Sequence, residues 1–471
     1  MIRDTDCLGK EWTDVYIDSE LNNYINKNAA KIIVLDDDPT GVQTVHNINV
    51  YTDWEIESIK RGFKEENKLF YILTNSRGFT VSETTACHKQ IISRIELVSK
   101  ELNTDYIIIS RSDSTLRGHY PLETNLLREG MEKHGGKHIN AEILCPFFKE
   151  GGRFTIDNIH YVKQDDKLIP AAETEFAKDA TFGYKSSDLT KYVEEKTNGE
   201  FKASDVTTIA IADLRNKNID GILQQLLQVD NYNKVVVNAT SYSELKVFMI
   251  ALYKALETGK RFTYRVAAGF VKVIGGISDK PLLKRDELIV SNNSNGGIVV
   301  VGSHTKKTSS QLEQLKTLEG IKFIEMNSDM VLVEGGLERE VERVVGIEEE
   351  EIVRGTTVVV YTKRKLLTLD NDTKEDALIR SVKISAAVCD LVGKLSVTPS
   401  FIVAKGGITS SDIGTKGLAV KRANVIGQIK PAIPVWQTGS ESRFPMIPYI
   451  IFPGNVGDIQ TLKEVVEILK S

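Results

Sequence analysis

The sequence predicts an α/β protein made of two α/β domains, each with a largely parallel sheet, that face each other across a central cleft. Three observations predict this fold. A chain of 471 residues is too long for one ordinary hydrophobic core. Short apolar runs alternate with longer amphipathic stretches, which is the pattern of parallel strands joined by crossover helices. That alternation stops at a polar segment near residue 290 and then begins again.

The first half contains apolar runs that we interpret as buried strands, at residues 32–35, 70–73, 106–109 and 143–145. A helix is predicted over residues 82–102, because apolar side chains recur there at three- and four-residue spacing: Cys87, Ile91, Ile95, Val98 and Leu102. Pro121 is expected to open another helix, which Gly135 and Gly136 would end. Residues 168–205 are charged and weakly periodic, and no element is assigned to them.

The second half repeats the pattern, with strands predicted at residues 298–301, 357–361, 401–404 and 432–436 and helices at 309–318 and 375–392. The polar segment 280–295 leads into the sequence SNNSNGG, which has the composition of a linker. We therefore expect an N-terminal domain over residues 1–290 and a C-terminal domain over residues 291–471. The acidic run at residues 348–351 is expected to be a solvated face.

Composition limits the classes of function. No apolar run reaches the eighteen or so residues of a membrane-spanning helix, and the first thirty residues lack the apolar stretch of a signal peptide. The four cysteines lie far apart and form no CxxC pair, which favours a reducing cytoplasm over a disulfide framework. A net charge of -5 gives no electrostatic footprint for nucleic acid. We expect a cytoplasmic protein with neither a membrane nor a nucleic acid as partner.

Three adjacent aspartates, Asp36, Asp37 and Asp38, follow the first predicted strand. In open parallel sheets, ligands bind beyond the carboxyl ends of the strands. Crowded like charges raise one another's pKa, and a cation or a hydroxyl-rich ligand would relieve the repulsion. Pro39 and Gly41 would fix the carboxylates in a tight turn. The alternative is an Asp-rich turn that only caps a helix, although one carboxylate suffices for a cap.

Two further polar segments follow strands. In residues 73–80, Arg77 could bind a carboxylate bidentately, although a plain surface arginine is equally consistent with that segment. Residues 109–123 hold two possible anion-binding cations, a carboxylate for hydroxyl groups, a hydroxyl and a histidine within nine positions: Arg111, Asp113, Ser114, Arg117 and His119. A connecting loop rarely needs so many polar side chains. We interpret this segment as part of a binding site.

The second half offers three glycine loops, each beside a predicted strand: Gly302 with Ser303, Gly406 with Gly407, and residues 452–457. Glycine lets backbone N–H groups approach phosphate oxygens, and a following helix N-terminus adds positive potential. Each loop alone could be an ordinary turn, but three in one domain favour a phosphate-binding crevice. None of them matches the Walker A or GxGxxG patterns.

Two hypotheses about the function come from these segments. Asp36, Asp38 and Thr40 spell DxDxT, and a later strand ends in Thr74–Asn75, which resembles the haloacid dehalogenase phosphatases. In that magnesium-dependent family the first aspartate is the nucleophile and the second the acid. The phosphatase hypothesis gives no role to the segment around Arg111 or to the glycine-rich half. A non-catalytic ligand sensor is the second hypothesis.

The fuller resemblance is to the four-carbon acid sugar kinase family. It rests on motifs in the family's order over nearly the whole chain: DDDPTG from residue 36, NSR from 75, RSDSTLRGH from 111, GS from 302, GGIT from 406 and PGNVG from 453. The resemblance implies an N-terminal domain for an acid such as threonate, erythronate or 3-oxotetronate, and a C-terminal domain for ATP. It implies phosphorylation of the acid's terminal hydroxyl with ATP and Mg²⁺, and it identifies no metal ligand.

By this resemblance, substrate would be held by Asp38, Arg77, Arg111, Ser112, Asp113 and Ser114. Nucleotide would be held by Ser303, Gly406, Gly407, Gly454, Asn455, Val456 and Gly457. Many relatives have ADDFTG in place of DDDPTG, and lysine in place of Arg111. Arginine binds a carboxylate in a different geometry from lysine, so the preferred acid can differ from that of the best-described members.

The catalytic candidates are Asp38 and Asp113, because each follows a strand within a dense polar cluster. We expect Asp38 to accept the hydroxyl proton and Asp113 to hold the substrate's other hydroxyls. Arg77 and Arg111 are expected to anchor the acid's carboxylate. The sequence leaves open the particular acid and the oligomeric state, for which a homodimer is one option.

Overall fold

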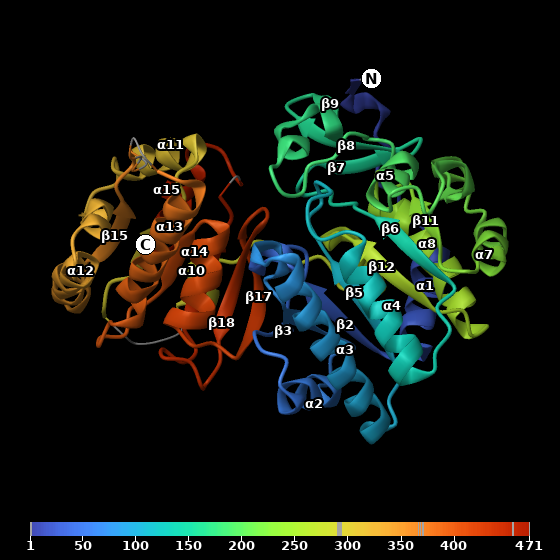
Figure 1. The fold of residues 1–471 in the computed structure, drawn as a ribbon, viewed down its shortest axis with the longest axis horizontal. Helices are drawn as coiled ribbons and strands as arrows, with labels where there is room; N and C mark the ends of the chain where they lie inside the picture. Colours follow the sequence, from blue (N-terminus) through green and yellow to red (C-terminus); the bar gives the residue numbers. More distant parts are fainter. Residues whose placement is uncertain are drawn as a thin grey trace. The chain divides into compact units, whose positions relative to one another are not determined.

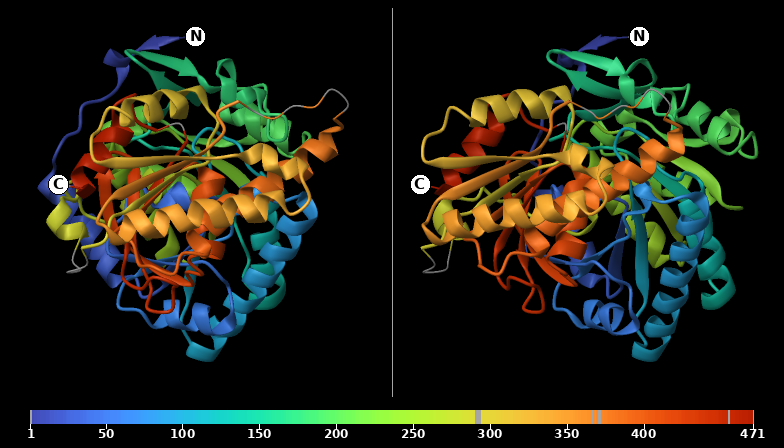
Figure 2. Two further views of the ribbon diagram at one scale, coloured as in Figure 1. Left: turned by 90° about the vertical axis from the view of Figure 1, so that its left-hand side faces the viewer. Right: turned by 60° about the vertical axis from the view of Figure 1, so that its left-hand side comes forward.

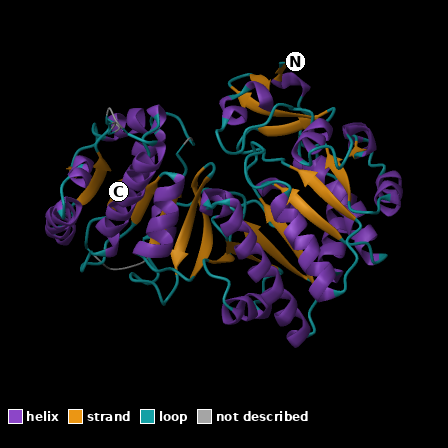
Figure 3. Ribbon diagram, in the orientation of Figure 1, coloured by secondary structure: helices purple, strands orange, loops and turns teal. Residues whose placement is uncertain are grey.

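The computed structural model describes residues 2–289, 294–365, 367, 369, 372–454 and 456–470. Residues 290–293 of the predicted linker segment, and the predicted nucleotide ligand Asn455, lie outside these residues. The chain forms two compact units. The first unit comprises residues 1–44 and 53–279, and the second comprises residues 45–52 and 280–471. Each unit is an α/β structure in which helices pack on a sheet (Figures 1 and 3), which confirms the predicted fold class.

The sheet of the first unit is entirely parallel. Its spatial order is β10 (Thr207–Ile209), β11 (Asn233–Val237), β6 (Ala141–Cys145), β12 (Phe262–Val266), β5 (Tyr106–Arg111), β2 (Lys31–Asp36) and β4 (Leu69–Leu73). The central strands are buried along their whole length, because helices cover both faces of the sheet. The carboxyl ends of β4, β2, β5 and β12 therefore lie side by side at one edge.

Helices α3 (Val81–Leu102) and α4 (Leu122–Gly135) cover one face of this sheet, and α1 (Val15–Lys27), α7 (Ile219–Gln228) and α8 (Tyr242–Glu257) cover the other (Figure 1). α3 begins where a capping box joins Thr80 and Glu83, and its predicted apolar stripe is mostly buried. α4 begins after Pro121 and ends before Gly136, which has a φ of 63°. The remaining helices are α2 (Ile56–Lys64), α5 (Leu189–Lys196), α6 (Ile211–Arg215) and α9 (Ala268–Ile274).

A smaller antiparallel sheet belongs to the first unit. Its order is β1 (Arg3–Asp4), β9 (Lys167–Pro170), β8 (Ile159–Gln164) and β7 (Arg153–Ile156). Residues 168–205, to which the sequence assigned nothing, continue from β9 through short 3₁₀ turns into α5. Their buried side chains pack against the loop after β5 and the strands β6 and β11, and include Tyr184, Leu189, Tyr192 and Val193. This segment is therefore part of the core of the unit.

The sheet of the second unit is mixed. Its order is β3 (Ile48–Tyr51), β17 (Arg422–Lys430), β18 (Ile433–Thr438), β19 (Pro448–Phe452), β16 (Ile402–Lys405), β13 (Ile298–Val301), β15 (Thr357–Thr362) and β14 (Ile321–Met326). The pairs from β19 to β14 are parallel. The pairs from β3 to β19 are antiparallel. The carboxyl ends of β19, β16, β13 and β15 are thus neighbours.

One face of this sheet packs against α11 (Lys306–Leu315) and α15 (Thr461–Lys470) around a core that includes Val299, Leu312 and Val465. α12 (Gly336–Val353) and α13 (Lys374–Gly393) lie along the strands as a helical pair (Figure 2). The shorter helices are α10 (Arg285–Leu288) and α14 (Gly407–Asp412), the latter continuing into a π-helical turn over Ile413–Gly417.

Two expectations need correction. The helix predicted over residues 309–318 begins three residues earlier, because the Thr305 side chain caps it. The acidic run at residues 348–351 is not a uniformly solvated face, because Glu348 is 0% exposed on the inner side of α12. None of the described helices has the length and apolar character needed to cross a membrane.

Candidate functional site

The three aspartates after β2 occupy different environments. Asp36 and Asp37 are buried, at 1% and 4% exposure, whereas Asp38 is half-buried. Asp38 caps the 3₁₀ turn Pro39–Val42, since its Oδ1 accepts a hydrogen bond from the Thr40 N–H at 2.8 Å. The capping alternative therefore describes Asp38 but not its two neighbours. Burial raises the pKa of Asp37 to about 7, although Arg77 acts in the opposite direction.

Two arginines from neighbouring strand ends neutralise this turn. Arg77 binds Asp37 bidentately, with N–O distances of 2.7 and 3.2 Å, and reaches Asp38 Oδ2 at 3.2 Å. Arg111 forms an ion pair with Asp36 and donates to the Asp38 carbonyl at 2.9 Å. The chain itself thus supplies the cations that relieve the crowding of the carboxylates.

Gly41 makes the position of Arg111 possible. A Cβ atom added at Gly41 would overlap the guanidinium of Arg111. Arg111 is only 5% exposed, so its guanidinium is enclosed between this glycine and Asp36. The glycine of the DDDPTG motif is therefore required here for close approach of a side chain rather than for a positive φ.

The loop after β5 carries Ser112, Asp113 and Ser114. Ser112 is buried and donates to Glu123 at 3.4 Å, while Asp113 and Ser114 are half-buried. Asp113 accepts from Arg117 Nε at 2.7 Å. Burial opposes its ionisation, but Arg77 and Arg117 outweigh this and hold the pKa of Asp113 well below its usual range. Asp113 is therefore a hydrogen-bond acceptor for hydroxyl groups and a poor proton acceptor.

The sequence-predicted acid-binding residues thus come together at one edge of the parallel sheet. Asp38, Arg77, Asp113 and Ser114 retain some exposure there, whereas Arg111 and Ser112 lie beneath them. The phosphatase hypothesis needs Asp36 as an exposed nucleophile. Its burial and its ion pair with Arg111 remove that basis.

The three predicted glycine loops also converge, within the second unit. Gly302 and Ser303 both donate backbone N–H groups to the Lys405 carbonyl at 3.3 Å. Gly406 has a φ of 129°, and a Cβ atom there would lie 3.2 Å from the Ser303 Cβ. A Cβ atom at Gly454 would lie 3.4 Å from Ser303 Oγ. The side chain of Ser303 is thus closely approached by the backbone of both glycine loops.

The glycine loop at the end of β19 also contacts α11. Gly457 has a φ of 78°, and the Val456 carbonyl accepts from Gln311 Nε2 at 3.2 Å. Gly407 is the first residue of α14, so its backbone belongs to that helix N-terminus. These positions place Gly407, Val456 and Gly457 beside the same strand ends as Ser303.

Sequence reasoning missed two cations at this edge. Lys405 is 0% exposed, and its Nζ donates to the carbonyls of Pro453 and Gly454 at 2.8 and 3.3 Å. Burial lowers the pKa of Lys405 to about 7. Arg364 donates to the Ser303 carbonyl at 2.6 Å, from the end of β15. The basic run that follows the predicted strand at residues 357–361 was the available signal for Arg364.

The residues also bear on a metal ion. Among the residues that the structure describes, no three His, Cys, Asp or Glu side chains are grouped to hold one. Mg²⁺ commonly keeps several waters and binds phosphate oxygens with one or two carboxylates. A Mg²⁺ ion carried mainly by nucleotide phosphates is compatible with these side chains, because it needs no such group of protein ligands.

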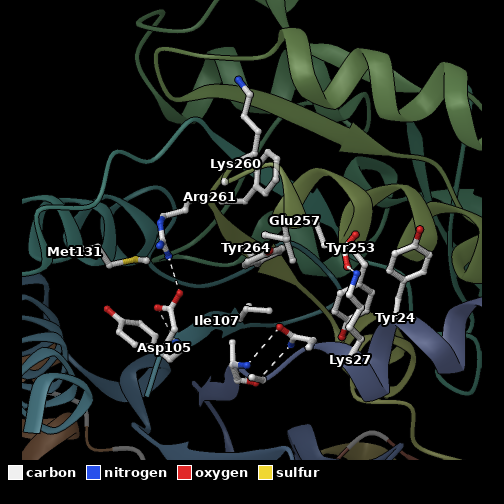
Figure 4. A pocket seen from close by; sticks show the side chains of 17 residues that line it. Tyr24, Lys27, Asp105, Ile107, Met131, Tyr253, Glu257, Lys260, Arg261 and Tyr264 are labelled. Atoms are coloured by element: carbon white, nitrogen blue, oxygen red, sulfur yellow. Dashed lines mark hydrogen bonds and ion pairs between the residues drawn. The ribbon is translucent and has the colours of Figure 1, made fainter. Parts of the chain in front are cut away.

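A cavity of about 320 Å³ lies elsewhere (Figure 4). It is lined by Tyr24, Tyr253 and Tyr264, and the ion pair between Arg261 and Asp105 lies beside it. The cavity is at the amino ends of β2, β5 and β12, opposite the edge that carries the aspartates. It is thus separate from the candidate site.

Comparisons with known proteins match the two parts of the chain to two different domain families. Residues 32–274 match a family model described as a sugar-binding N-terminal domain. Residues 298–462 match a model described as a nucleotide-binding C-terminal domain. No curated protein matches the sequence.

Solved structures share the fold. The Haemophilus influenzae protein HI1011, a DUF1537 member, has a TM-score of 0.61 at 17% identity, over 92% of this chain and 99% of that chain. A Salmonella typhimurium LT2 chain described as a proposed tRNA synthase has a TM-score of 0.66 at 15% identity, over 92% and 98%. A Bordetella bronchiseptica DUF1537 chain, described as a domain-swapped dimer with bound citrate, has a TM-score of 0.39 at 15% identity, over 93% and 98%.

The fold and the two matched domains define a sugar- and nucleotide-binding α/β protein. The chain belongs to the family in which these two domains follow one another, the architecture of the four-carbon acid sugar kinases.

Proposed function

We propose that this protein is an ATP-dependent kinase that phosphorylates the terminal hydroxyl of a four-carbon or similarly small acid sugar. The observation that carries the proposal is the pairing of two sites in one chain. A carboxylate–arginine cluster lies in the unit matched as sugar-binding, and a serine enclosed by glycines lies in the unit matched as nucleotide-binding. All four cysteines are free thiols, which supports a reducing compartment such as the cytoplasm.

On the nucleotide side, Ser303, Gly406, Gly407 and residues 454–457 would surround the phosphates of ATP. ATP with Mg²⁺ supplies the phosphoryl group and offsets its charge. The protein's part is to present the Ser303 hydroxyl and the close backbone approach that the glycines allow, since the N–H groups of Ser303 and Gly406 already donate to carbonyls of the sheet. Lys405 supports this arrangement, because it binds the carbonyls of Pro453 and Gly454 from the buried side.

On the acid side, we propose that Asp38 orients the substrate hydroxyl and accepts its proton. Arg77 fixes the Asp38 carboxylate, and Thr40 fixes its other oxygen. Asp113 and Ser114 would hold further hydroxyls of the substrate. Arg111 and Ser112 would act from beneath, since Arg111 binds Asp36 and Ser112 binds Glu123.

The test is a screen of four-carbon and branched sugar acids with ATP and Mg²⁺, with ADP formation followed in a coupled assay. We expect acid-dependent ADP formation with at least one acid and none without acid. Acid binding without any turnover would identify a ligand sensor instead. Phosphate release from a phosphorylated acid without nucleotide would restore the phosphatase hypothesis.

A further inference from the structure

Arg153 differs from the other arginines near Asp113. Arg77, Arg111 and Arg117 each form an ion pair with an aspartate, and Arg265 donates to the Arg117 carbonyl at 2.7 Å. The side chain of Arg153 donates no hydrogen bond and forms no ion pair within the described part of the chain. Its Nε atom is buried without a hydrogen-bond partner, as is the Nε atom of Arg111, but Arg153 has no ion pair beside it in the described ranges. A desolvated guanidinium with unused donors is costly unless a ligand satisfies it.

Arg153 also lies beside the candidate site. Its guanidinium is 5.6 Å from the Phe176 ring centroid, and the guanidinium of Arg117 is 5.1 Å from the same ring. Arg117 in turn binds Asp113. Arg153 is half-buried, so part of the residue remains accessible although its Nε atom is buried.

The surroundings hold Arg153 and the Asp113 loop together. Arg153 begins β7, whose backbone pairs with Phe148 and β8. From β8, His160 contacts the Ser114 carbonyl at 2.7 Å through Nε2, and its Nδ1 lies 3.0 Å from the Thr155 hydroxyl.

The segment after β9 holds the same loop. The hydroxyls of Tyr184 and Tyr192 donate to the Thr115 and Leu116 carbonyls at 2.8 and 2.9 Å. These bonds tie the small sheet to the loop after β5, so Arg153 keeps a fixed place relative to Asp113. Figure 1 shows β7, β8 and α5 together in this part of the first unit.

We infer that Arg153, with Arg117 beside it, binds the carboxylate of the acid sugar and makes the site prefer an acid over a neutral sugar. The inference rests on the proposed function for its substrate class. It assigns to the acid a guanidinium that has no ion-pair partner among the described residues, whereas Arg77 and Arg111 are each paired with aspartates of the turn after β2. A planar guanidinium can take both carboxylate oxygens at once, and Asp113 beside it can take a hydroxyl.

The experiment uses the full-length protein in four forms: wild type, Arg153→Gln, Arg153→Lys and the matched control Arg61→Gln, which changes an exposed arginine on α2. Binding of threonate and erythronate is measured by calorimetry without nucleotide. Turnover with ATP is then compared between each acid and its neutral polyol, in which a hydroxymethyl group replaces the carboxylate. Thermal unfolding of each variant reports whether it is folded.

We expect Arg153→Gln to weaken acid binding about tenfold or more, with polyol turnover and the KM for ATP unchanged. Arg153→Lys should fall between Gln and wild type, and it serves as the probe if the Gln variant unfolds. Arg61→Gln should match wild type. An unchanged preference for acid over polyol in both Arg153 variants would overturn the inference.

The binding and turnover measurements separate the two proposals. Arg153-dependent acid binding without any ADP formation would refute the kinase and keep the carboxylate site. ADP formation at the same rate in the Arg153 variants as in wild type would support the kinase and refute the carboxylate site. An absence of acid binding in wild type would refute both.

Discussion

The close contact between Gly41 and Arg111 lets us predict how much stability the Gly41→Ala substitution removes. A methyl group at Gly41 overlaps the guanidinium, so Gly41→Ala must displace it. If Arg111 only shifts, the cost is that of overpacking, about 1–3 kcal/mol. If Arg111 leaves Asp36, a buried charge loses its partner, which costs about 3–5 kcal/mol. We expect the larger value, because Asp36 is 1% exposed and Arg111 has little room to move.

The assay is urea unfolding of Gly41→Ala, Arg111→Ala and the double variant. Arg111→Ala alone should already lose about 3–5 kcal/mol, since it leaves Asp36 without its cation. Adding the methyl group to that background should then cost under about 1 kcal/mol, because the space has been emptied. Gly78→Ala in the neighbouring loop is the control, since a Cβ atom there meets nothing within 4 Å. Additive effects of the two substitutions would refute the proposed steric coupling.

Three further predictions follow from the same contacts. Asp38→Asn should lower kcat about 10²–10⁴-fold while leaving acid affinity nearly intact. Asp113→Asn should chiefly raise the KM for the acid. Steady-state kinetics that show the reverse pattern would exchange the two roles. Gly406→Ala should raise the KM for ATP strongly, because its φ of 129° and the nearby Ser303 leave no place for a side chain, and an unchanged KM would remove this loop from the nucleotide site. Burial raises the pKa of Glu348 well above its usual range. Below the unfolded pKa this carboxyl is protonated in both states and its ionisation does not lower the free energy of unfolding. The destabilisation grows as the pH rises from the unfolded pKa towards the folded pKa. Glu348→Gln should therefore raise the melting temperature at pH 8 more than at pH 5, and an equal gain at both would contradict this.

Much of the fold was predictable because its main strands are buried and short. The apolar runs that begin at residues 32, 70, 106 and 298 are continuous, as expected for parallel strands with helices on both faces of the sheet. Each of these runs forms a strand in the structure. The strand-end rule then located both polar clusters without any coordinates. Sequence periodicity could not reveal that residues 45–52 supply β3, which pairs with β17 of the second unit, because that pairing joins residues far apart in the sequence.

The partners of individual charges were not predictable. Arg77 and Arg111 were predicted to anchor the acid's carboxylate, but spacing along the chain cannot show that both form ion pairs with the aspartates after β2. Lys405 was visible only as the residue before two glycines, and its buried contacts depend on the neighbouring strand. Glu348 looked solvated because it belongs to an acidic run. In each case the partner or the burial of the charged group depends on residues that lie close in space but far apart in the sequence.

The segment that the sequence could not assign, residues 168–205, holds the loop that carries Asp113. It has few long apolar runs, and two of its tyrosine hydroxyls donate to the backbone of the loop after β5, to which His160 of β8 adds a further contact. Such bonds leave no periodic pattern, yet they fix Asp113 relative to Arg153 as firmly as a strand would. The aspartate turn, by contrast, is held by ion pairs with Arg77 and Arg111 from neighbouring strand ends. A change of preferred acid would therefore arise more readily from substitutions around Arg153 than from changes in the DDDPTG motif, whose Gly41 and Arg111 constrain one another sterically.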